Sequence, residues 1–297
     1  MIPLFDLHCD TLLELYKQKE KFEDNSLHIS LKKVQNFSKY LQVGAIWSDY
    51  RLTDDEAYFR CLDVIKYAQS QNINFAVNLS DIYKYNFILG IEDSRLLNNN
   101  IQRLDYLHSL GVRVLTLNWK NNSCIGGGWN TSIPLSNFGK NVILRAYELG
   151  ITVDVSHSSV ETFWDVIALS ETLGFSPIAS HLNSNSVCNH KRNLNDEQIK
   201  KICNLKGLIG INLVPEHIGI NYDLDSILKH IDYFLKLGCF NCLCLGCDFD
   251  GTNVLPCDIN SVEDLPHLFY KIQYEFGKEI AMKIFFENAF NFFEKKL

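Results

Sequence analysis

The chain has 297 residues, a formal net charge of −7, and 46% hydrophobic and 21% charged residues, which is an ordinary composition for a globular protein. Its 19 Phe and 13 Tyr supply ample core material, which excludes a disordered chain. The acidic balance argues against a nucleic-acid partner, and the lack of any run of about 18 uncharged apolar residues argues against a membrane span.

The first residues of the chain bear on its compartment. Residues 1–8 contain neither a basic segment nor a long apolar one, so no export signal is recognised. We therefore predict a cytoplasmic protein in which disulfides are rare. Several of the ten cysteines, among them Cys61, Cys203 and Cys244, lie in apolar runs, and we predict that they pack as small hydrophobic side chains.

Short apolar runs alternate along the chain with longer segments of helical character. The runs are nearly continuous rather than alternating in polarity, which indicates strands buried on both faces. The predicted strands are Pro3–Leu7, Leu41–Trp47, Phe87–Ile91, Val112–Leu117, Ile151–Val155, Pro177–Ala179, Gly207–Val214 and Cys242–Cys247. The predicted helices are Glu56–Gln71, Arg95–Leu110, Gly139–Gly150, Val160–Gly174, Asp196–Leu205, Leu224–Gly238 and Glu275–Lys295.

This repetition predicts a parallel sheet. Eight strand–helix units fit a closed (β/α)8 TIM-type barrel better than an open sheet. No linker or change of composition divides the chain, so residues 1–297 are predicted to form one domain. The polar segment Lys17–Lys39 is predicted to be a loop after the first strand.

In a barrel of this kind, functional side chains lie at the carboxyl ends of the strands. Six of the predicted strands end in side chains that could carry chemistry, whereas the second and seventh offer nothing comparable. These ends are His8-Cys9-Asp10, Glu92-Asp93, Asn118-Trp119, Ser156-His157, Ser180-His181 and Asp248-Phe249-Asp250.

Barrel closure would bring most of these side chains around one axis. The predicted ligand set is His8, Asp10, Glu92, His157 and His181, with Asp248 beside it. Unpaired carboxylates are costly to bury, so three of them in one pocket imply a compensating positive charge. Because no lysine lies at these strand ends, we predict a metal site. Imidazole and carboxylate ligands favour zinc, with manganese, iron and cobalt as alternatives.

The order and spacing of several short motifs resemble the membrane (renal) dipeptidase family of the amidohydrolase superfamily. The matching segments are Phe5-Asp6-Leu7-His8-Cys9-Asp10, Gly90-Ile91-Glu92, Asp154-Val155-Ser156-His157-Ser158-Ser159, Ser180-His181, His190-Lys191-Arg192-Asn193, Gly246-Cys247-Asp248-Phe249-Asp250-Gly251 and Glu287-Asn288-Ala289. The resemblance implies a binuclear zinc hydrolase that cleaves dipeptides and tolerates a D-residue at the carboxyl-terminal position.

The resemblance also implies a role for each site residue. His8 and Asp10 would bind one zinc ion, His157 and His181 the other, and Glu92 would bridge the two. Asp248 would be the acid/base, and Arg192 would hold the terminal carboxylate of the substrate. General chemistry agrees with these roles, since two divalent ions can share a hydroxide and a nearby carboxylate can carry the proton to the leaving amine.

Two residues depart from the family pattern, and the first of them leaves the substrate specificity open. Trp119 stands where many relatives have a histidine that contacts the substrate, and an indole donates one hydrogen bond but carries no charge. Lys191 stands where the family has a proline, which would loosen that loop and add positive charge.

Two alternative functions stay open at the sequence level. The same scaffold could act on a cyclic amide, an N-acyl amino acid or a lactone, because fold does not determine function. The spacing Cys239-x-x-Cys242-x-Cys244-x-x-Cys247 could instead indicate a non-catalytic metal or redox protein. We favour packed thiols, because Cys242 and Cys244 should share a strand face that Cys247 opposes.

The loops near the predicted site and the oligomeric state can also be predicted. Asp250 and Asn193 are predicted to stabilise loops rather than to react. The Gly126–Trp129 segment is predicted to be a mobile loop beside the pocket, with Trp129 as an apolar wall. A homodimer is expected because two-fold oligomers are common.

Overall fold

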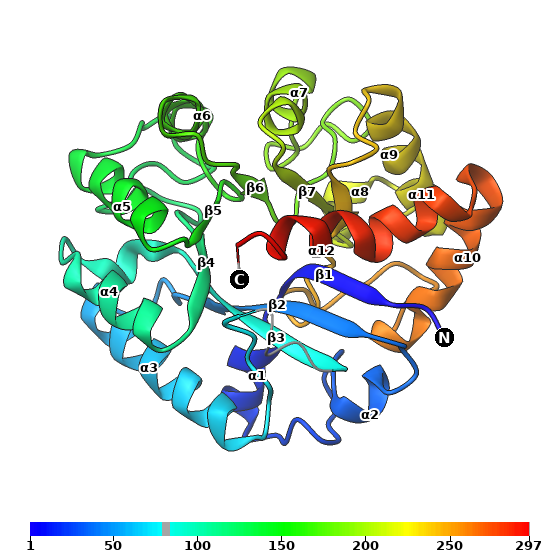
Figure 1. Cartoon of the computed structure of the whole chain (residues 1–297), viewed down its shortest axis with the longest axis horizontal. Helices are drawn as coiled ribbons and strands as arrows, with labels where there is room; N and C mark the ends of the chain where they lie inside the picture. The colour runs from blue at the N-terminus through cyan, green and yellow to red at the C-terminus, as the bar shows by residue number, and fades with distance from the viewer. Residues whose placement is uncertain (79–83, 297) are drawn as a thin grey trace.

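The computed structural model describes residues 1–78 and 84–296. Parallel strands form a closed barrel in which they neighbour one another in sequence order (Figure 1). The strands are β1 Leu4–Cys9, β2 Tyr40–Trp47, β3 Tyr85–Glu92, β4 Val112–Thr116, β5 Thr152–Asp154, β6 Ile178–Ala179, β7 Leu208–Ile211 and β8 Leu243–Leu245. The predicted (β/α)8 fold is therefore confirmed.

Helices surround the barrel on its outside (Figure 1). The longer ones are α1 Thr11–Gln18, α3 Asp54–Ser70, α4 Gln102–Ser109, α5 Asn137–Glu148, α6 Val160–Leu173, α7 Asp196–Asn204, α9 Leu224–Lys236 and α10 Leu265–Phe276. The shorter ones are α2 Leu31–Val34, η2 Ser94–Leu97, α8 Pro215–Ile218, η3 Val262–Asp264, α11 Lys278–Met282, the π-helical segment η4 Lys283–Glu287 and α12 Asn288–Phe293.

Local sequence explains where several of these helices begin. Thr53 and Glu56 form a capping box at the start of α3, and Asn195 and Gln198 form another at the start of α7. Each box satisfies backbone N–H groups that the first helical turn leaves unpaired. At the other end of α6, Gly174 takes a left-handed conformation that glycine adopts without steric cost.

Two apolar clusters make up the core. One cluster includes Phe5, Leu7, Val43 and Ile88, which belong to β1, β2 and β3. The larger cluster fills the layer between strands and helices. The inner cluster is closed by the carboxyl-terminal helix, where Phe293 packs against Phe5 with ring centroids 5.3 Å apart.

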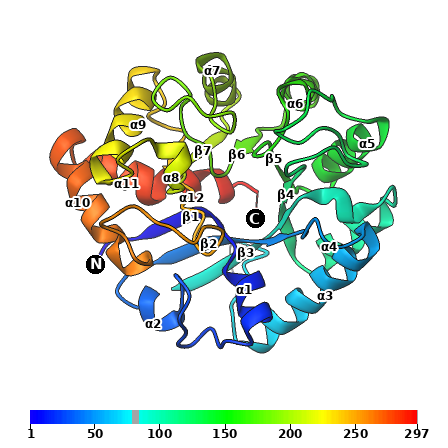
Figure 2. The same ribbon diagram turned by 180° about the vertical axis from the view of Figure 1, so that it is seen from behind.

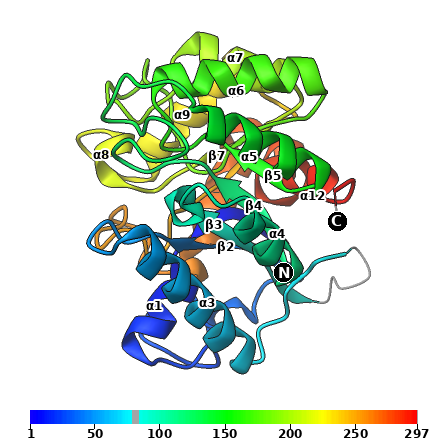
Figure 3. The same cartoon turned by 90° about the vertical axis from the view of Figure 1, so that its left-hand side faces the viewer.

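The two ends of the barrel are therefore different. α12 crosses one end, whereas α8 follows the carboxyl end of β7 and lies on the opposite side (Figure 3). Figure 2 brings α8 toward the viewer and leaves α12 behind the barrel. The end near α8 is open to side chains from the strand tips, and the end under α12 is filled by aromatic rings.

Several predicted element boundaries were wrong. Two helices, α1 and α2, lie within or next to the segment predicted to be a loop after the first strand. The predicted helix Arg95–Leu110 is divided into η2 and α4. The predicted helix Glu275–Lys295 crosses a break at Gly277, whose φ is 90°, and corresponds mainly to α11, η4 and α12. The helix before this break, α10, begins at Leu265 with a proline in its first turn and was not predicted.

None of the helices in the described parts of the chain is long and apolar enough to cross a bilayer. The cytoplasmic location stays a prediction. So does the domain boundary, whose last residue, 297, lies outside the described residues.

Candidate metal centre and substrate cleft

The strand tips bring the predicted ligands together at the open end of the barrel. His8 lies in β1 and Asp10 directly after it, while Glu92 ends β3. His157 and His181 follow β5 and β6. All five are buried, with no more than 7% of any of them exposed. The convergence predicted from the sequence is thus present.

Glu92 lies between two groups of side chains. Its Oε2 is 3.4 Å from His8 Nε2, and its Oε1 is 2.9 Å from His157 Nε2. On the first side Asp10 Oδ2 is 3.6 Å and Asp248 Oδ1 3.8 Å from the same His8 nitrogen. One carboxylate therefore faces both groups, with one oxygen toward each.

The second group is formed by the two later histidines. His157 Nε2 and His181 Nε2 lie 2.8 Å apart. His181 Nδ1 is 2.7 Å from Ser180 Oγ, which in turn lies 2.6 Å from Asp154 Oδ2. If Ser180 donates to Asp154, then His181 Nδ1–H donates to Ser180, and the Nε2 lone pair points into the site. Such a hydrogen bond sets the tautomer of a metal-binding imidazole.

Asp154 was not singled out as a site residue at the sequence level. It is fully buried and also accepts hydrogen bonds from the backbone N–H groups of Ser156 and Ser180 and from Thr116 Oγ1. A charged residue at the end of a buried strand was the signal that could have revealed it, because a buried carboxylate needs several donors.

Local backbone geometry also marks the site. His157 and Asp248 have φ values of 64° and 62°, in the left-handed region. Non-glycine residues adopt this region rarely, and such positions cluster at functional sites. Next to them, a Cβ on Gly251 would lie 2.2 Å from Asp248 Oδ1 and 2.4 Å from Asp10 Oδ2. Glycine at position 251 leaves the space that these two carboxylates occupy.

Burial controls the ionisation of the carboxylates. It raises the pKa of Glu92 to about 7, with the nearby Asp10 charge adding to the effect. Burial likewise raises the pKa of Asp248 to about 6. Desolvation lowers the pKa values of His157 and His181 well below the usual range. Without a cation, the repulsion and burial of these acidic groups cost free energy.

The donor set fits metal ions. His8 Nε2 and His157 Nδ1 are buried and have no hydrogen-bond partner among the described residues. His8, Glu92 and His181 offer ligand atoms that all lie within 4.8 Å of one another, as do His8, Asp10 and Asp248. Neutral imidazoles and carboxylates in this arrangement are typical ligands of divalent transition metals.

A cleft of about 650 Å³ opens above this cluster. Trp119 lines it and is half-buried, with its ring 6.2 Å from that of His157 and stacked on Tyr50 at 5.7 Å. Trp47 contacts both rings, with its centroid 4.9 Å from that of Trp119 and 6.1 Å from that of Tyr50. Trp119 therefore forms an aromatic wall of the cleft next to the cluster.

Arg192 also lines the cleft and has unusual surroundings for an arginine. It is 8% exposed, and its Nε and Nη2 atoms are buried without a hydrogen-bond partner among the described residues. Burial lowers its pKa to about 10, while Asp248 and Glu92 act in the opposite direction. A guanidinium with unused donors in the wall of a cleft is suited to bind a carboxylate in a bidentate manner.

Neighbouring loop residues behave largely as the sequence predicted. Asn193 Nδ2 donates to the carbonyl oxygens of Cys188 and His217. Asp250 accepts from Thr11 Oγ1 and His28 N. Lys191 is exposed and lines a second cavity, of about 390 Å³, which adjoins Arg192.

The glycine-rich loop, which was predicted to be mobile, is closely packed. Gly126, Gly127 and Gly128 are buried, and a Cβ on Gly128 would lie 2.4 Å from Trp119 O. The loop is thus packed closely against the chain that carries Trp119. Trp129, which follows, lines the second cavity with Arg192, as an apolar wall would.

A hydrogen-bond network beyond β7 was not predicted from the sequence. Asn212 Nδ2 lies 2.9 Å from His217 Nδ1 and also donates to His181 O. Its Oδ1 accepts from Asn183 Nδ2 at 2.9 Å. The position of Asn212, directly after a buried strand, was the available signal. This network links the strand tips to His217, which lines the cleft with Arg192.

The cysteine prediction needs correction. Cys203 is not a lone packed thiol: it forms a disulfide with Cys242. Cys242 does not share a face with Cys244, because β8 begins only at Leu243, and Cys244 lies in the inner core cluster. Cys244 and Cys247 are free and buried, so the four-cysteine cluster considered from the spacing does not form.

Comparison with known proteins identifies the family. Residues 1–296 match the family model described as membrane dipeptidase, peptidase family M19. The chain belongs to the membrane dipeptidase family. It is thereby a metallo-dipeptidase by class, in agreement with the resemblance seen in its motifs.

The relatives of this membrane dipeptidase are distant in sequence. An uncharacterised dipeptidase of Schizosaccharomyces pombe is 24% identical over 91% of this chain and 75% of its own length. An uncharacterised protein of Acinetobacter calcoaceticus is 28% identical over 56% of this chain. The match spans only 58% of that protein's length.

Solved structures share the fold over nearly the whole chain. The dipeptidase AC, a metallopeptidase, superposes with a TM-score of 0.90 at 22% identity and covers 99% of this chain and 98% of its own. A metallopeptidase from Rhodobacter sphaeroides, liganded with a phosphinate mimic of the dipeptide L-Ala-D-Ala, has a TM-score of 0.88 at 21% identity, with coverage of 100% and 99%. At these identities the likeness establishes the fold.

Proposed function

We propose that this chain is a zinc-dependent hydrolase of dipeptides, both L,L and L,D. The observation that carries the proposal is the buried Arg192, which has unpartnered donors and lines the same cleft as the His and carboxylate cluster. A carboxylate clamp next to a metal cluster suits a short substrate whose free carboxyl terminus is close to the scissile bond. The dipeptide mimic bound by the Rhodobacter sphaeroides structure is consistent with this reading.

The cluster would hold two zinc ions. His8 and Asp10 would bind one, His157 and His181 the other, and Glu92 would bridge them, since its two oxygens face the two groups. When bound, such a pair supplies a hydroxide nucleophile at neutral pH and polarises the carbonyl of the substrate.

The other side chains have separate roles. Arg192 binds the terminal carboxylate and so fixes the position of the peptide bond. Asp248 takes up a proton near the cluster and returns it to the leaving amine, a transfer suited to a carboxyl group with a raised pKa. Trp119 limits the space on one side of the cleft.

The first experiment compares substrates on the zinc-loaded protein. L-Ala-L-Ala and L-Ala-D-Ala are assayed beside N-acetyl-alanine, a lactone and the carboxamide of L-Ala-L-Ala. We expect cleavage of the dipeptides and weak activity on the carboxamide, which lacks the carboxylate. Turnover of the N-acyl amino acid or lactone with none of the dipeptides would instead favour another hydrolase of the same scaffold.

A variant tests the clamp. Arg192→Ala removes charge-assisted hydrogen bonds of about 1.5–3 kcal/mol, so KM for L-Ala-L-Ala should rise roughly 10- to 100-fold. The exposed neighbour Lys191 offers a control, and Lys191→Ala should change KM little. Steady-state kinetics measures both, and an unchanged KM in Arg192→Ala would refute the clamp.

A further inference from the structure

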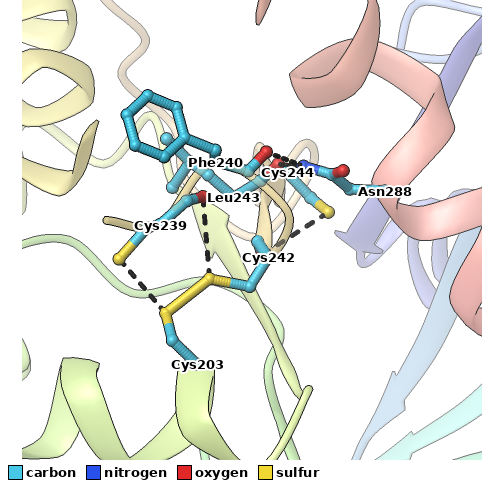
Figure 4. The surroundings of a disulfide bond; sticks show 7 residues. All are labelled: Cys203, Cys239, Phe240, Cys242, Leu243, Cys244 and Asn288. Atoms are coloured by element: carbon cyan, nitrogen blue, oxygen red, sulfur yellow. Dashed lines mark hydrogen bonds between the residues drawn. A yellow bond between two sulfur atoms is a disulfide. The ribbon is translucent and has the colours of Figure 1, made fainter. Parts of the chain in front are cut away.

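Three cysteine sulfur atoms meet at the end of the barrel opposite the cleft. Cys203 lies in the last turn of α7, Cys239 follows α9, and Cys242 directly precedes β8. Their sulfur atoms all lie within 4.8 Å of one another. Figure 4 shows Cys203 and Cys242 joined as a disulfide, with the Cys239 sulfur directed at Cys203. The sulfur atoms of Cys239 and Cys203 are 3.1 Å apart. We call these residues the cysteine trio.

The turn that carries two of the three cysteines is held in place. Leu243 N donates to Cys239 O, which closes the turn. Asn288 Nδ2, from α12, lies 3.1 Å from Phe240 O and 2.9 Å from Leu243 O (Figure 4). Asn288 is itself 7% exposed. The positions of Cys239 and Cys242 are thus fixed by hydrogen bonds that do not involve sulfur.

The disulfide accounts for only two of the three sulfur atoms. Cys239 is fully buried and free, and it contacts a disulfide at the carboxyl-terminal ends of α7 and α9. Buried, apolar surroundings and a helix carboxyl terminus both disfavour a free thiolate. Thiol–disulfide exchange by Cys239 would therefore be slow, because the thiolate is the attacking species.

A bound cation would account for the convergence of all three sulfur atoms. Thiolates bind soft cations such as zinc or copper(I), and the charge of the ion offsets most of the charge of the thiolates. Zinc–sulfur bonds of about 2.3 Å place tetrahedral sulfur ligands about 3.8 Å apart. Reduction of the disulfide therefore has to let Cys203 Sγ move slightly away from the other two sulfur atoms, which all lie within 4.8 Å of one another. Cys203 is partly exposed, so water can occupy a fourth position.

We propose that the cysteine trio, in its reduced form, binds one thiophilic cation, with zinc as the expected ion. Binding converts three thiols to thiolates and releases three protons to solvent. The disulfide is the alternative state of the same site, and a thiol reductant that supplies two electrons returns it to the thiols. This site is separate from the His and carboxylate cluster.

Cobalt(II) is the probe, because sulfur-to-cobalt charge transfer absorbs in the near ultraviolet and histidine or carboxylate ligands give no such band. The full chain is reduced, stripped with a chelator, and titrated with Co²⁺ without oxygen. We expect a charge-transfer band that saturates at one ion per chain, beside the weaker visible bands of the other cluster. Added Zn²⁺ should abolish the band.

Variants assign the band to its ligands. Cys239→Ser should lose it and bind one metal ion fewer per chain, as measured by mass spectrometry of the elements, while the visible bands of the other cluster show that the variant is folded. Cys244→Ala is the matched control, because Cys244 is buried two residues along but outside the trio, and it should keep the band. A band that persists in Cys239→Ser would overturn the proposal.

Alkylation of the wild-type chain provides a readout that needs no variant. With Zn²⁺ present, Cys203, Cys239 and Cys242 should become resistant to iodoacetamide, whereas the exposed Cys257 should react with or without the metal. Absence of the cobalt band and of zinc protection in the reduced chain would show that the trio holds a disulfide only.

Discussion

Asp248 and Asp250 lie two residues apart, yet their surroundings differ. Asp248 Oδ1 is 3.8 Å from His8 Nε2, next to the candidate metal cluster. Asp250 is tied instead to Thr11 Oγ1 and His28 N. The environment of each carboxylate, rather than its position in the motif, separates a group that can exchange protons from one that fixes a loop.

Asp248→Asn tests the proton-transfer role. The amide keeps the shape of the side chain but cannot accept and return a proton, so kcat should fall by roughly 10²- to 10⁴-fold. The amount of bound metal and KM should change little. Asp250→Asn serves as the comparison and should lower Tm while keeping most of kcat. Steady-state kinetics with Asp248→Asn that matches the unaltered protein would exclude Asp248 as the acid/base.

Ser180 connects a proposed metal ligand to a buried carboxylate, since its hydroxyl lies between His181 Nδ1 and Asp154 Oδ2. Ser180→Ala should weaken zinc binding by about 10- to 100-fold, as is usual for hydrogen bonds that orient metal ligands. Thr116→Val removes another donor to Asp154 without touching His181 and should weaken binding less. Calorimetric titration of each metal-free variant with zinc compares the two affinities. Equal zinc affinities of Ser180→Ala and Thr116→Val would show that the serine does not orient His181.

At the level of elements, α9 is joined to the open end of the barrel through one histidine. His230 is fully buried; its Nδ1 accepts from Ser184 N at 3.2 Å, and its Nε2 lies 3.0 Å from Ile218 O. The histidine thus links α9 to the loop after β6 and to α8. Both segments border Asn183 and His217, which belong to the network behind the cleft.

This contact predicts a pH dependence of stability. Burial lowers the pKa of His230 from 6.5 to about 4. Between these values the unfolded chain binds the proton and the folded chain does not, so the contribution is complete above pH 6.5 and is lost as the pH falls. From pH 7 to pH 5 the loss amounts to roughly 2 kcal/mol.

His230→Gln isolates that contribution, because glutamine can donate and accept but does not titrate. The variant should be less stable at pH 7, and its free energy of unfolding should fall less steeply between pH 7 and pH 5 than that of the unaltered protein. Urea unfolding at several pH values measures the difference between the two slopes. Equal pH slopes of the free energy of unfolding in the two proteins would mean that His230 is protonated equally in the folded and unfolded states.

For the whole molecule, the barrel concentrates buried acidic groups at one end and apolar rings at the other. Glu92, Asp10 and Asp248 lie within one cluster, while Phe5 and Phe293 fill the opposite end. Holding these carboxylates close together costs free energy when no cation is bound. The fold is therefore expected to gain stability from any ion that binds there.

Metal removal tests this expectation. An ion present at about 100 times its Kd stabilises the folded state by about 2.7 kcal/mol, which for a chain of this size corresponds to a Tm shift of roughly 5 °C. Chelation should lower Tm by this amount, and zinc should restore it. Glu92→Gln should show a smaller shift, because the proposed bridge is weakened. Scanning calorimetry that gives one Tm with and without zinc would contradict the binuclear site.

Much of this architecture could be inferred from the order of residues. Buried apolar runs mark parallel strands, because such strands are covered on both faces. Polar residues at the ends of these runs gave His8, Glu92 and His181, since barrel closure brings strand ends to one rim. Helix boundaries were harder to predict: α10 was missed and one helix was predicted across Gly277, because the aromatic and apolar pattern continues past that glycine into the following helices.

Other features depended on tertiary structure alone. Asp154 and Asn212 became site residues only through partners that lie 26 and 31 residues away in the chain. The cysteine trio joins Cys203 to a turn 36 residues later, and no local spacing encodes that contact. The chain order determines which face of a strand or helix is apolar, because that pattern is local. Which polar atoms meet is decided by packing, because their partners come from separate strands and helices.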